Sequence, residues 1–126
     1  MTTPRPGVAR WLLLDVVLVI IFAAVGRSSH AEALNPLGLL STAWPFVVAT
    51  LLAWVVGRYW RVDRRPYRVW PEGVVVWLIT VVVGLGLRVL SGDTAQLPFI
   101  IVATISLALL LLGWRAIAQL VLRRRT

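Results

Sequence analysis

The chain has 126 residues, which is room for one domain, and we take residues 1–126 as a single transmembrane domain. Hydrophobic residues make up 60% of it and charged residues 14%, too few to cover the surface that a small soluble domain exposes. The composition therefore excludes a water-soluble fold and indicates a chain whose solvent is lipid. The absence of cysteine excludes disulfides, thiolate metal sites and cysteine nucleophiles.

Four apolar blocks follow one another along the chain, each close to the ~20 residues that a helix needs to cross the hydrocarbon core. The breaks between them are rich in Gly, Pro, Asn and Arg, which favour turns. β-branched residues are common inside the blocks, but uncharged runs of this length are typical of membrane-buried helices. The sequence thus predicts an all-α, polytopic membrane protein whose four transmembrane helices cover about residues 9–26, 39–59, 73–90 and 97–122.

The first block carries an acid, Asp15, about one turn inside the apolar span. A carboxylate at the centre of a membrane helix costs about 2.5–3.5 kcal/mol on insertion, so Asp15 should be protonated, paired or facing a cavity. Arg115, in the last block, is expected on the same side of the membrane and is its natural partner. The pair would lock the first helix to the last; the alternative is a proton-linked or cation-linked site.

A cleaved signal peptide is the rival interpretation of the first block. Arg5 and Arg10 would form its basic region, and residues 31–33 read Ala-Glu-Ala, which resembles a cleavage site. Asp15 inside the apolar core counts against this interpretation, so we expect the block to persist as a helix.

The first and third blocks end in arginines, Arg27 and Arg88, and the lone histidine, His30, follows the first. Guanidinium groups bind phosphates and carboxylates bidentately, so Arg27, His30 and Arg88 are candidate ligands for an anion or a lipid headgroup. The alternative is that each arginine extends to the headgroups or pairs with an acid of its own loop, Glu32 or Asp93.

The basic residues also predict the orientation. Ten of the 13 lie in the N-terminal tail, the middle connection and the C-terminal end, whereas two lie in the other connections. Under the positive-inside rule, both termini are cytoplasmic in a multi-pass protein of the inner (plasma) membrane. Orientation thus explains the net charge of +8 without nucleic acid. The tryptophans expected at the cytoplasmic headgroup level are Trp11, Trp60, Trp70 and Trp114.

The two halves of the sequence echo each other. In each, a helix ending near Gly-Arg is followed by a polar loop and then by Thr-Ala, Pro-Phe and Ala-Thr pairs. This pattern predicts two pseudo-symmetric helical hairpins. Small residues also recur at four-residue spacing and indicate close helix packing, either within one chain or between copies. They are Ala49, Ala53 and Gly57 in the second block, with Thr80 and Gly84 in the third.

Several short segments between about Trp11 and Ala116 form a recognisable set. They are Asp15, the Gly-Arg-Ser-Ser-His run at 26–30, Ala-Trp-Pro-Phe at 43–46, Trp70-Pro71 with Gly73, and Gly-Trp-Arg at 113–115. Together they resemble a family of small bacterial membrane proteins, the domain-of-unknown-function family numbered 3054. The resemblance implies a four-helix membrane protein of about this length and brings no established activity, ligand or partner.

The sequence contains no Walker loop, dinucleotide glycine fingerprint, catalytic-triad set or zinc-binding helix motif. We therefore expect no catalytic residues, no metal site and no cofactor. A non-catalytic membrane component or accessory subunit is favoured, surrounded by the lipid bilayer and assembled as a homo-oligomer or with another membrane protein. Two alternatives stay open: a small-solute or ion transporter or channel that acts as an oligomer, and a lipid-acting membrane enzyme.

Overall fold

The computed structural model describes residues 8–29, 36–58, 65–92 and 97–124. These residues form the helices α1 (Val8–Ser29), α2 (Pro36–Gly57), α3 (Val74–Leu90) and α4 (Leu97–Arg124), with a short π-helical turn, η1 (Val69–Gly73), leading directly into α3. Within the described ranges there is no strand. The predicted all-α fold is therefore confirmed, with four helices in these ranges long and apolar enough to cross a membrane.

The second helix is displaced toward the N-terminus relative to the predicted span from Leu39 to Tyr59. It begins at Pro36, because a proline fits the first helical position, where its missing N–H needs no partner. It ends at Gly57, since Arg58 takes up the left-handed conformation, with φ 53°, that commonly terminates helices.

The third span begins earlier than the predicted residue 73, because η1 is added before it. The peptide bond between Trp70 and Pro71 is cis, and Trp70 has an extended backbone (φ −121°, ψ 131°) inside the turn. The amide N–H of Gly73 donates to the carbonyl of Arg68 over 2.8 Å. The chain therefore enters α3 through a tight, hydrogen-bonded corner instead of a plain helix start.

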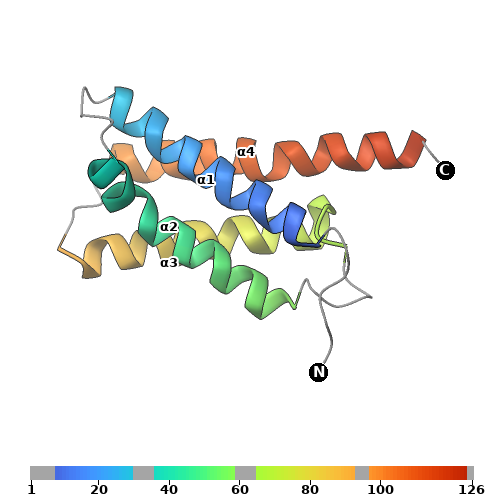
Figure 1. Cartoon of the computed structure of the whole chain (residues 1–126), viewed down its shortest axis with the longest axis horizontal. Coiled ribbons are helices and arrows are strands. Elements are labelled where there is room, and N and C mark those ends of the chain that lie inside the picture. The colour runs from blue at the N-terminus through green and yellow to red at the C-terminus, as the bar shows by residue number, and fades with distance from the viewer. Residues whose placement is uncertain (1–7, 30–35, 59–64, 93–96, 125–126) are drawn as a thin grey trace.

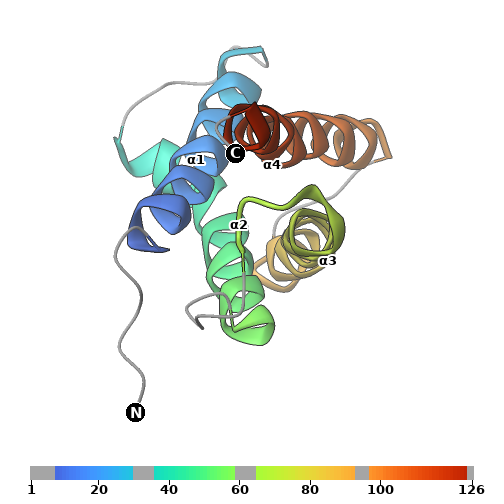
Figure 2. The same cartoon turned by 90° about the vertical axis from the view of Figure 1, so that its right-hand side faces the viewer.

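The helices form a ring in which each contacts the next, α1 with α2, α2 with α3, α3 with α4, and α4 with α1. Figure 1 shows that α1 begins and α4 ends on the same side of the bundle, where η1 also lies. We call this side the termini end and the opposite side the loop end. Figure 2 looks onto the termini end and shows α2 lying between α1 and α3.

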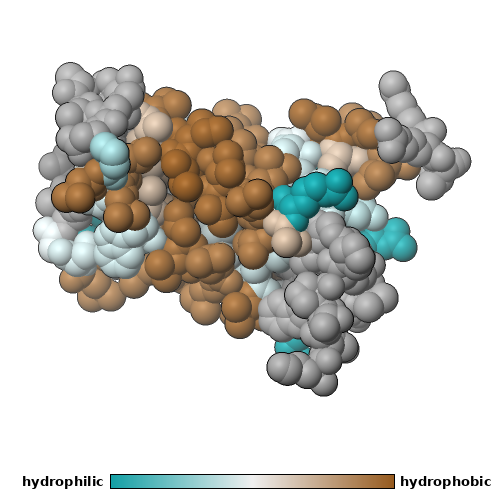
Figure 3. All heavy atoms as spheres, in the orientation of Figure 1, coloured by the Kyte–Doolittle hydropathy of each residue, from teal (hydrophilic) through white to brown (hydrophobic). Residues whose placement is uncertain are grey.

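The outer surface of the bundle differs from that of a soluble protein. Large apolar side chains are exposed on the outside of the bundle, and brown residues dominate the middle of the face drawn in Figure 3. Polar and charged side chains are buried inside: Asp15, Thr50, Glu72, Thr80 and Arg115. Lipid as the solvent explains this arrangement, because polar groups must find partners within the protein. The chain is thus a multi-pass membrane protein whose outer surface contacts the bilayer.

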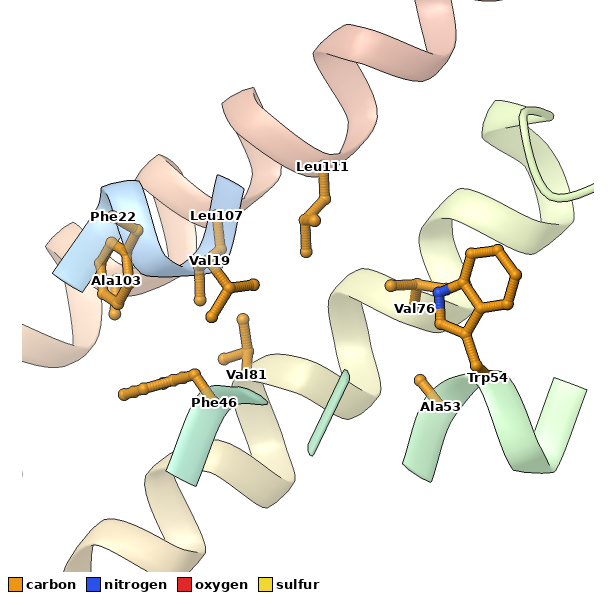
Figure 4. Packing of buried hydrophobic residues seen from close by; sticks show 10 residues of the cluster. All are labelled: Val19, Phe22, Phe46, Ala53, Trp54, Val76, Val81, Ala103, Leu107 and Leu111. Carbon is orange, nitrogen blue, oxygen red and sulfur yellow. The ribbon is translucent and has the colours of Figure 1, made fainter. Parts of the chain in front are cut away.

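The core draws on every helix of the described bundle. Phe22 on α1, Phe46 on α2, Val81 on α3 and Leu107 on α4 converge in its apolar centre (Figure 4). The rings of Phe22 and Phe46 meet edge to face, with centroids 5.3 Å apart.

Small residues let α2 and α3 approach closely. Ala49 and Ala53 are fully buried on α2, and a Cβ added to Gly84 of α3 would overlap the Phe46 ring. The hydroxyl groups of Thr50 and Thr80 are hydrogen-bonded across this contact at 3.1 Å. The small-residue rows therefore serve packing inside one chain, a point that the sequence left open.

Candidate functional site

A buried carboxylate, Asp15, forms the centre of a polar cluster in the half of the bundle nearer the termini end. Asp15 and Arg115 both have no exposed side-chain surface. The guanidinium binds both carboxylate oxygens: Nη1 donates to Oδ1 over 2.8 Å and Nη2 to Oδ2 over 2.7 Å. This bidentate geometry is the strongest arrangement for such a pair. It joins α1 directly to α4.

Two tryptophans complete the shell around the carboxylate. The indole N–H of Trp54, on α2, donates to Oδ2 over 2.8 Å, and that of Trp114, on α4, donates to Oδ1 over 2.8 Å. Each oxygen of Asp15 therefore accepts two hydrogen bonds. Since an ionised carboxylate offers about four lone-pair sites, its accepting capacity is used in full. We call Asp15, Trp54, Trp114 and Arg115 the carboxylate clamp.

The guanidinium of Arg115 also holds backbone groups. Its Nε donates to the carbonyl of Pro66 over 2.7 Å, and Nη1 donates to the carbonyl of Leu111 over 3.0 Å. Pro66 is buried in the segment that leads into η1. The same side chain thus ties α1, α4 and the connection before α3 together, and at least four of its five N–H donors are used.

The corner at Gly73 makes room for the Arg115 side chain. A Cβ at this position would lie 2.7 Å from Cδ of Arg115, 3.0 Å from a methyl carbon of Leu112 and 3.1 Å from the carbonyl oxygen of Arg68. Because the guanidinium is fixed at its far end, the Cδ cannot move aside freely. The close passage of η1 over the clamp therefore requires glycine.

Aromatic rings adjoin the clamp. The Trp11 and Trp114 rings are stacked with centroids 5.3 Å apart and an interplanar angle of 9°, and Tyr67 lies 5.8 Å from Trp11. Cζ of Arg115 lies 4.4 Å from the centroid of the Trp114 ring, and Cζ of Arg10 lies 5.6 Å from that of Trp11. The contact between Arg115 and Trp114 adds a cation–π attraction to the ion pair.

The predicted position of the tryptophans at the cytoplasmic headgroup level stays a prediction. Trp70 is 72% exposed. Trp114 instead turns its N–H to Asp15, and Trp11 stacks on it, because a buried carboxylate binds an indole N–H that would otherwise need a partner of its own. Trp60 lies outside the described residues.

Sequence reasoning missed two members of this region. Trp54 was given no role, although it is 4% exposed and binds Asp15. Glu72, in η1, was not expected to be buried, yet it is also 4% exposed. No group of three or more His, Cys, Asp or Glu residues that could hold a metal ion occurs among the described residues.

Of the three candidate residues at the loop end, only Arg88 has a described side chain. His30 lies outside the described residues, and so does the side chain of Arg27, which is part of α1. Arg88 is partly exposed near the end of α3, with Cζ 4.3 Å from the centroid of the Phe99 ring on α4. An anion or lipid-headgroup site of Arg27, His30 and Arg88 stays a prediction.

Comparison with known proteins gives one match. No curated protein matches the chain, and no solved structure matches it. A family model matches residues 12–118, a stretch that contains the whole carboxylate clamp and most of the four-helix bundle in the described ranges. The family resemblance of the sequence is therefore confirmed: the chain belongs to the family described as "Protein of unknown function (DUF3054)".

Proposed function

We propose that this protein is a non-catalytic membrane component, an accessory or scaffold subunit that acts through assembly in the bilayer. The observation that carries this proposal is the saturation of Asp15. A charged residue inside a membrane span marks a functional site by default, since it is expensive to place there. Here the carboxylate of Asp15 is paired with Arg115 and accepts four hydrogen bonds. The cost of burying its charge is therefore explained by its role in joining the helices.

Transport through Asp15 would require the carboxylate to exchange a proton or a cation during each cycle. Either event needs a free lone pair on the oxygens, and the four donors of the clamp take them all. A cation would also have to displace Arg115, whose guanidinium is held by the carbonyls of Pro66 and Leu111 as well. The saturated clamp therefore favours a structural pair over a transport site.

An enzyme would require a group able to touch a substrate. Asp15 and Arg115 are fully buried and occupied by each other, which leaves them unsuited to general acid–base work. Their arrangement supports a static role.

The assembly role is tested by extracting the tagged chain from its native membrane in lipid nanodiscs and weighing the intact complexes by mass spectrometry. The proposal expects a second protein at fixed stoichiometry or a defined homo-oligomer, absent from extracts without the tagged chain. It would be contradicted by a chain that is recovered alone, moves a solute across vesicle membranes and loses this flux in a folded Asp15→Asn variant.

We further propose that both termini face the cytoplasm and that the protein resides in the inner membrane. The support is the arginine distribution, ten against two. Because the chain has no cysteine, single introduced cysteines report topology without background. A membrane-impermeant maleimide should label Ser91→Cys in intact cells and should label Thr3→Cys after the cells are opened. The reverse order of labelling would overturn the orientation.

A further inference from the structure

A groove of about 490 Å³ runs along the membrane-facing side of the bundle between α3 and α4. Its lining includes Val69 of η1, Trp77 of α3, and Thr104, Ala108, Gly113 and Ala116 of α4. From Thr104 to Ala116 the helix rises about 18 Å at ~1.5 Å per residue. The groove is therefore long and narrow and follows the axis of α4 through the apolar layer.

The polar groups in the lining are already used within the protein. The indole N–H of Trp77 donates to the carbonyl of Thr104 over 3.0 Å, and the Thr104 hydroxyl donates to the carbonyl of Ile100 over 2.7 Å. The remaining lining residues are apolar. The groove therefore offers an apolar surface, and the part of a ligand that lies in it must be apolar as well.

The end of the groove near η1 has a different chemistry. The backbone N–H of Val69 donates to the side-chain oxygen of Gln119 over 2.9 Å, which joins η1 to α4 at this point. Arg65 and Arg68, both exposed, come shortly before Val69, and the exposed Trp70 follows it. Arginines and tryptophans in such positions are typical of the headgroup level of a membrane.

The size of the groove matches a hydrocarbon chain that lies along α4 for ~18 Å. A single hydrocarbon chain about 5 Å wide occupies roughly 350 Å³ over the same length. The volume therefore fits one acyl chain.

We propose that this groove binds one anionic phospholipid. One acyl chain lies along α3 and α4 between Trp77 and Gly113, and the phosphate is held by the guanidinium of Arg68, which suits phosphate geometry. A negatively charged headgroup is favoured over a zwitterionic one because Arg65 adds a second positive charge at the same end. This site lies apart from the carboxylate clamp and does not depend on the proposed assembly role.

Substitutions at two glycines test the acyl-chain site. A Cβ added to Gly113 meets no atom within 4 Å, so Gly113→Trp should fold normally and fill the groove. A Cβ added to Gly86, on α3 outside the groove lining, also meets no atom within 4 Å, so Gly86→Trp is a matched control. In native mass spectrometry of the full chain with added phosphatidylglycerol, the wild type and Gly86→Trp should retain one lipid, and Gly113→Trp should lose it.

The headgroup contact is tested in the same experiment. Arg68→Gln should weaken phosphatidylglycerol retention about fivefold, the effect of one arginine near a membrane surface. Arg58→Gln removes an equal charge from the end of α2 and should leave retention unchanged. The proposal is overturned if phosphatidylcholine is retained equally well or if Gly113→Trp keeps the lipid. It is also overturned if the wild type is a dimer that Gly113→Trp dissociates, since a second copy would then fill the groove.

Discussion

Two regions of the bundle interior hold the helices together by opposite means. In the carboxylate clamp, α1, α2 and α4 are joined by an ion pair and two indole hydrogen bonds around Asp15. In the contact between α2 and α3, the helices are held by close van der Waals packing, with Gly84 against Phe46 and small side chains along α2. The clamp depends on specific charged and hydrogen-bonding atoms. The contact between α2 and α3 depends on residues with small side chains or none.

This difference follows from the solvent. Lipid is as apolar as a leucine side chain, so burying apolar surface against another helix gains little in a membrane. What remains is close packing, which small residues permit, and hydrogen bonding between groups that lipid cannot satisfy. The clamp should therefore be sensitive to the loss of a charge or a donor, whereas the contact between α2 and α3 should be sensitive to added volume.

Loss of one charge from the clamp is expected to have the largest effect. Asp15→Asn keeps the shape of the side chain but leaves the buried Arg115 without its counter-charge, which should lower the free energy of unfolding by about 3–5 kcal/mol. Unfolding in mild detergent by added denaturing detergent measures this change. Arg58→Gln, at an exposed position, is the control and should shift stability by less than about 0.5 kcal/mol. If Asp15→Asn lowered the free energy of unfolding no more than the control does, the clamp would not depend on the charge of Asp15.

Loss of one donor should be the next largest effect. Trp54→Phe keeps most of the buried ring but removes an N–H that donates to a charged acceptor, and we expect a loss of about 1.5–3 kcal/mol in the same assay. Trp70→Phe changes the same residue type at a position that is 72% exposed and should have little effect. Equal losses in the two variants would mean that the indole hydrogen bond contributes nothing specific.

Added volume should damage the contact between α2 and α3. Gly84→Ala forces a methyl group against the Phe46 ring and should cost about 1–3 kcal/mol. Adding Phe46→Leu should recover part of this loss, because it makes room for the methyl group. Gly86→Ala, where the space is open, should be neutral or stabilising by up to about 1 kcal/mol. If Gly84→Ala behaves like Gly86→Ala, the helices are not packed as closely as described.

Loss of a hydroxyl from the same contact should have the smallest effect. Thr80→Val removes its hydrogen bond to Thr50, but the Thr50 hydroxyl also bonds to the carbonyl of Phe46 over 2.8 Å. Hydrogen bonds between membrane helices average about 0.6 kcal/mol, and we expect a loss of that order. A loss larger than that of Trp54→Phe would show that polar contacts, not packing, dominate between α2 and α3.

The fold could be predicted from the sequence because hydropathy and length alone identify membrane spans. The precise ends could not, because they depend on local geometry: Pro36 extends α2 backward, Arg58 ends it, and the corner at Trp70 and Pro71 adds η1. None of these features alters hydropathy over a window of about 20 residues.

Only the two charged residues of the candidate site could be predicted from the sequence. Asp15 and Arg115 stand out because ionisable residues are rare in apolar spans, and the structure joins them at 2.7 Å. Trp54 lies 39 positions from Asp15 in the chain, and Pro66 contributes a backbone carbonyl, so neither carries a local signal of its contact. The role of Trp114 was obscured, because an indole near a helix end has an equally good explanation at the headgroups.

A double-mutant cycle on Asp15→Asn and Arg115→Gln, measured as the free energy of unfolding in detergent, tests the central claim that the buried charges form one structural unit. The account predicts that the double variant is little less stable than either single variant, because losing the second charge removes a group already left without its partner. Independent, additive losses would contradict it, since they would show that Asp15 and Arg115 stabilise the bundle through separate contacts.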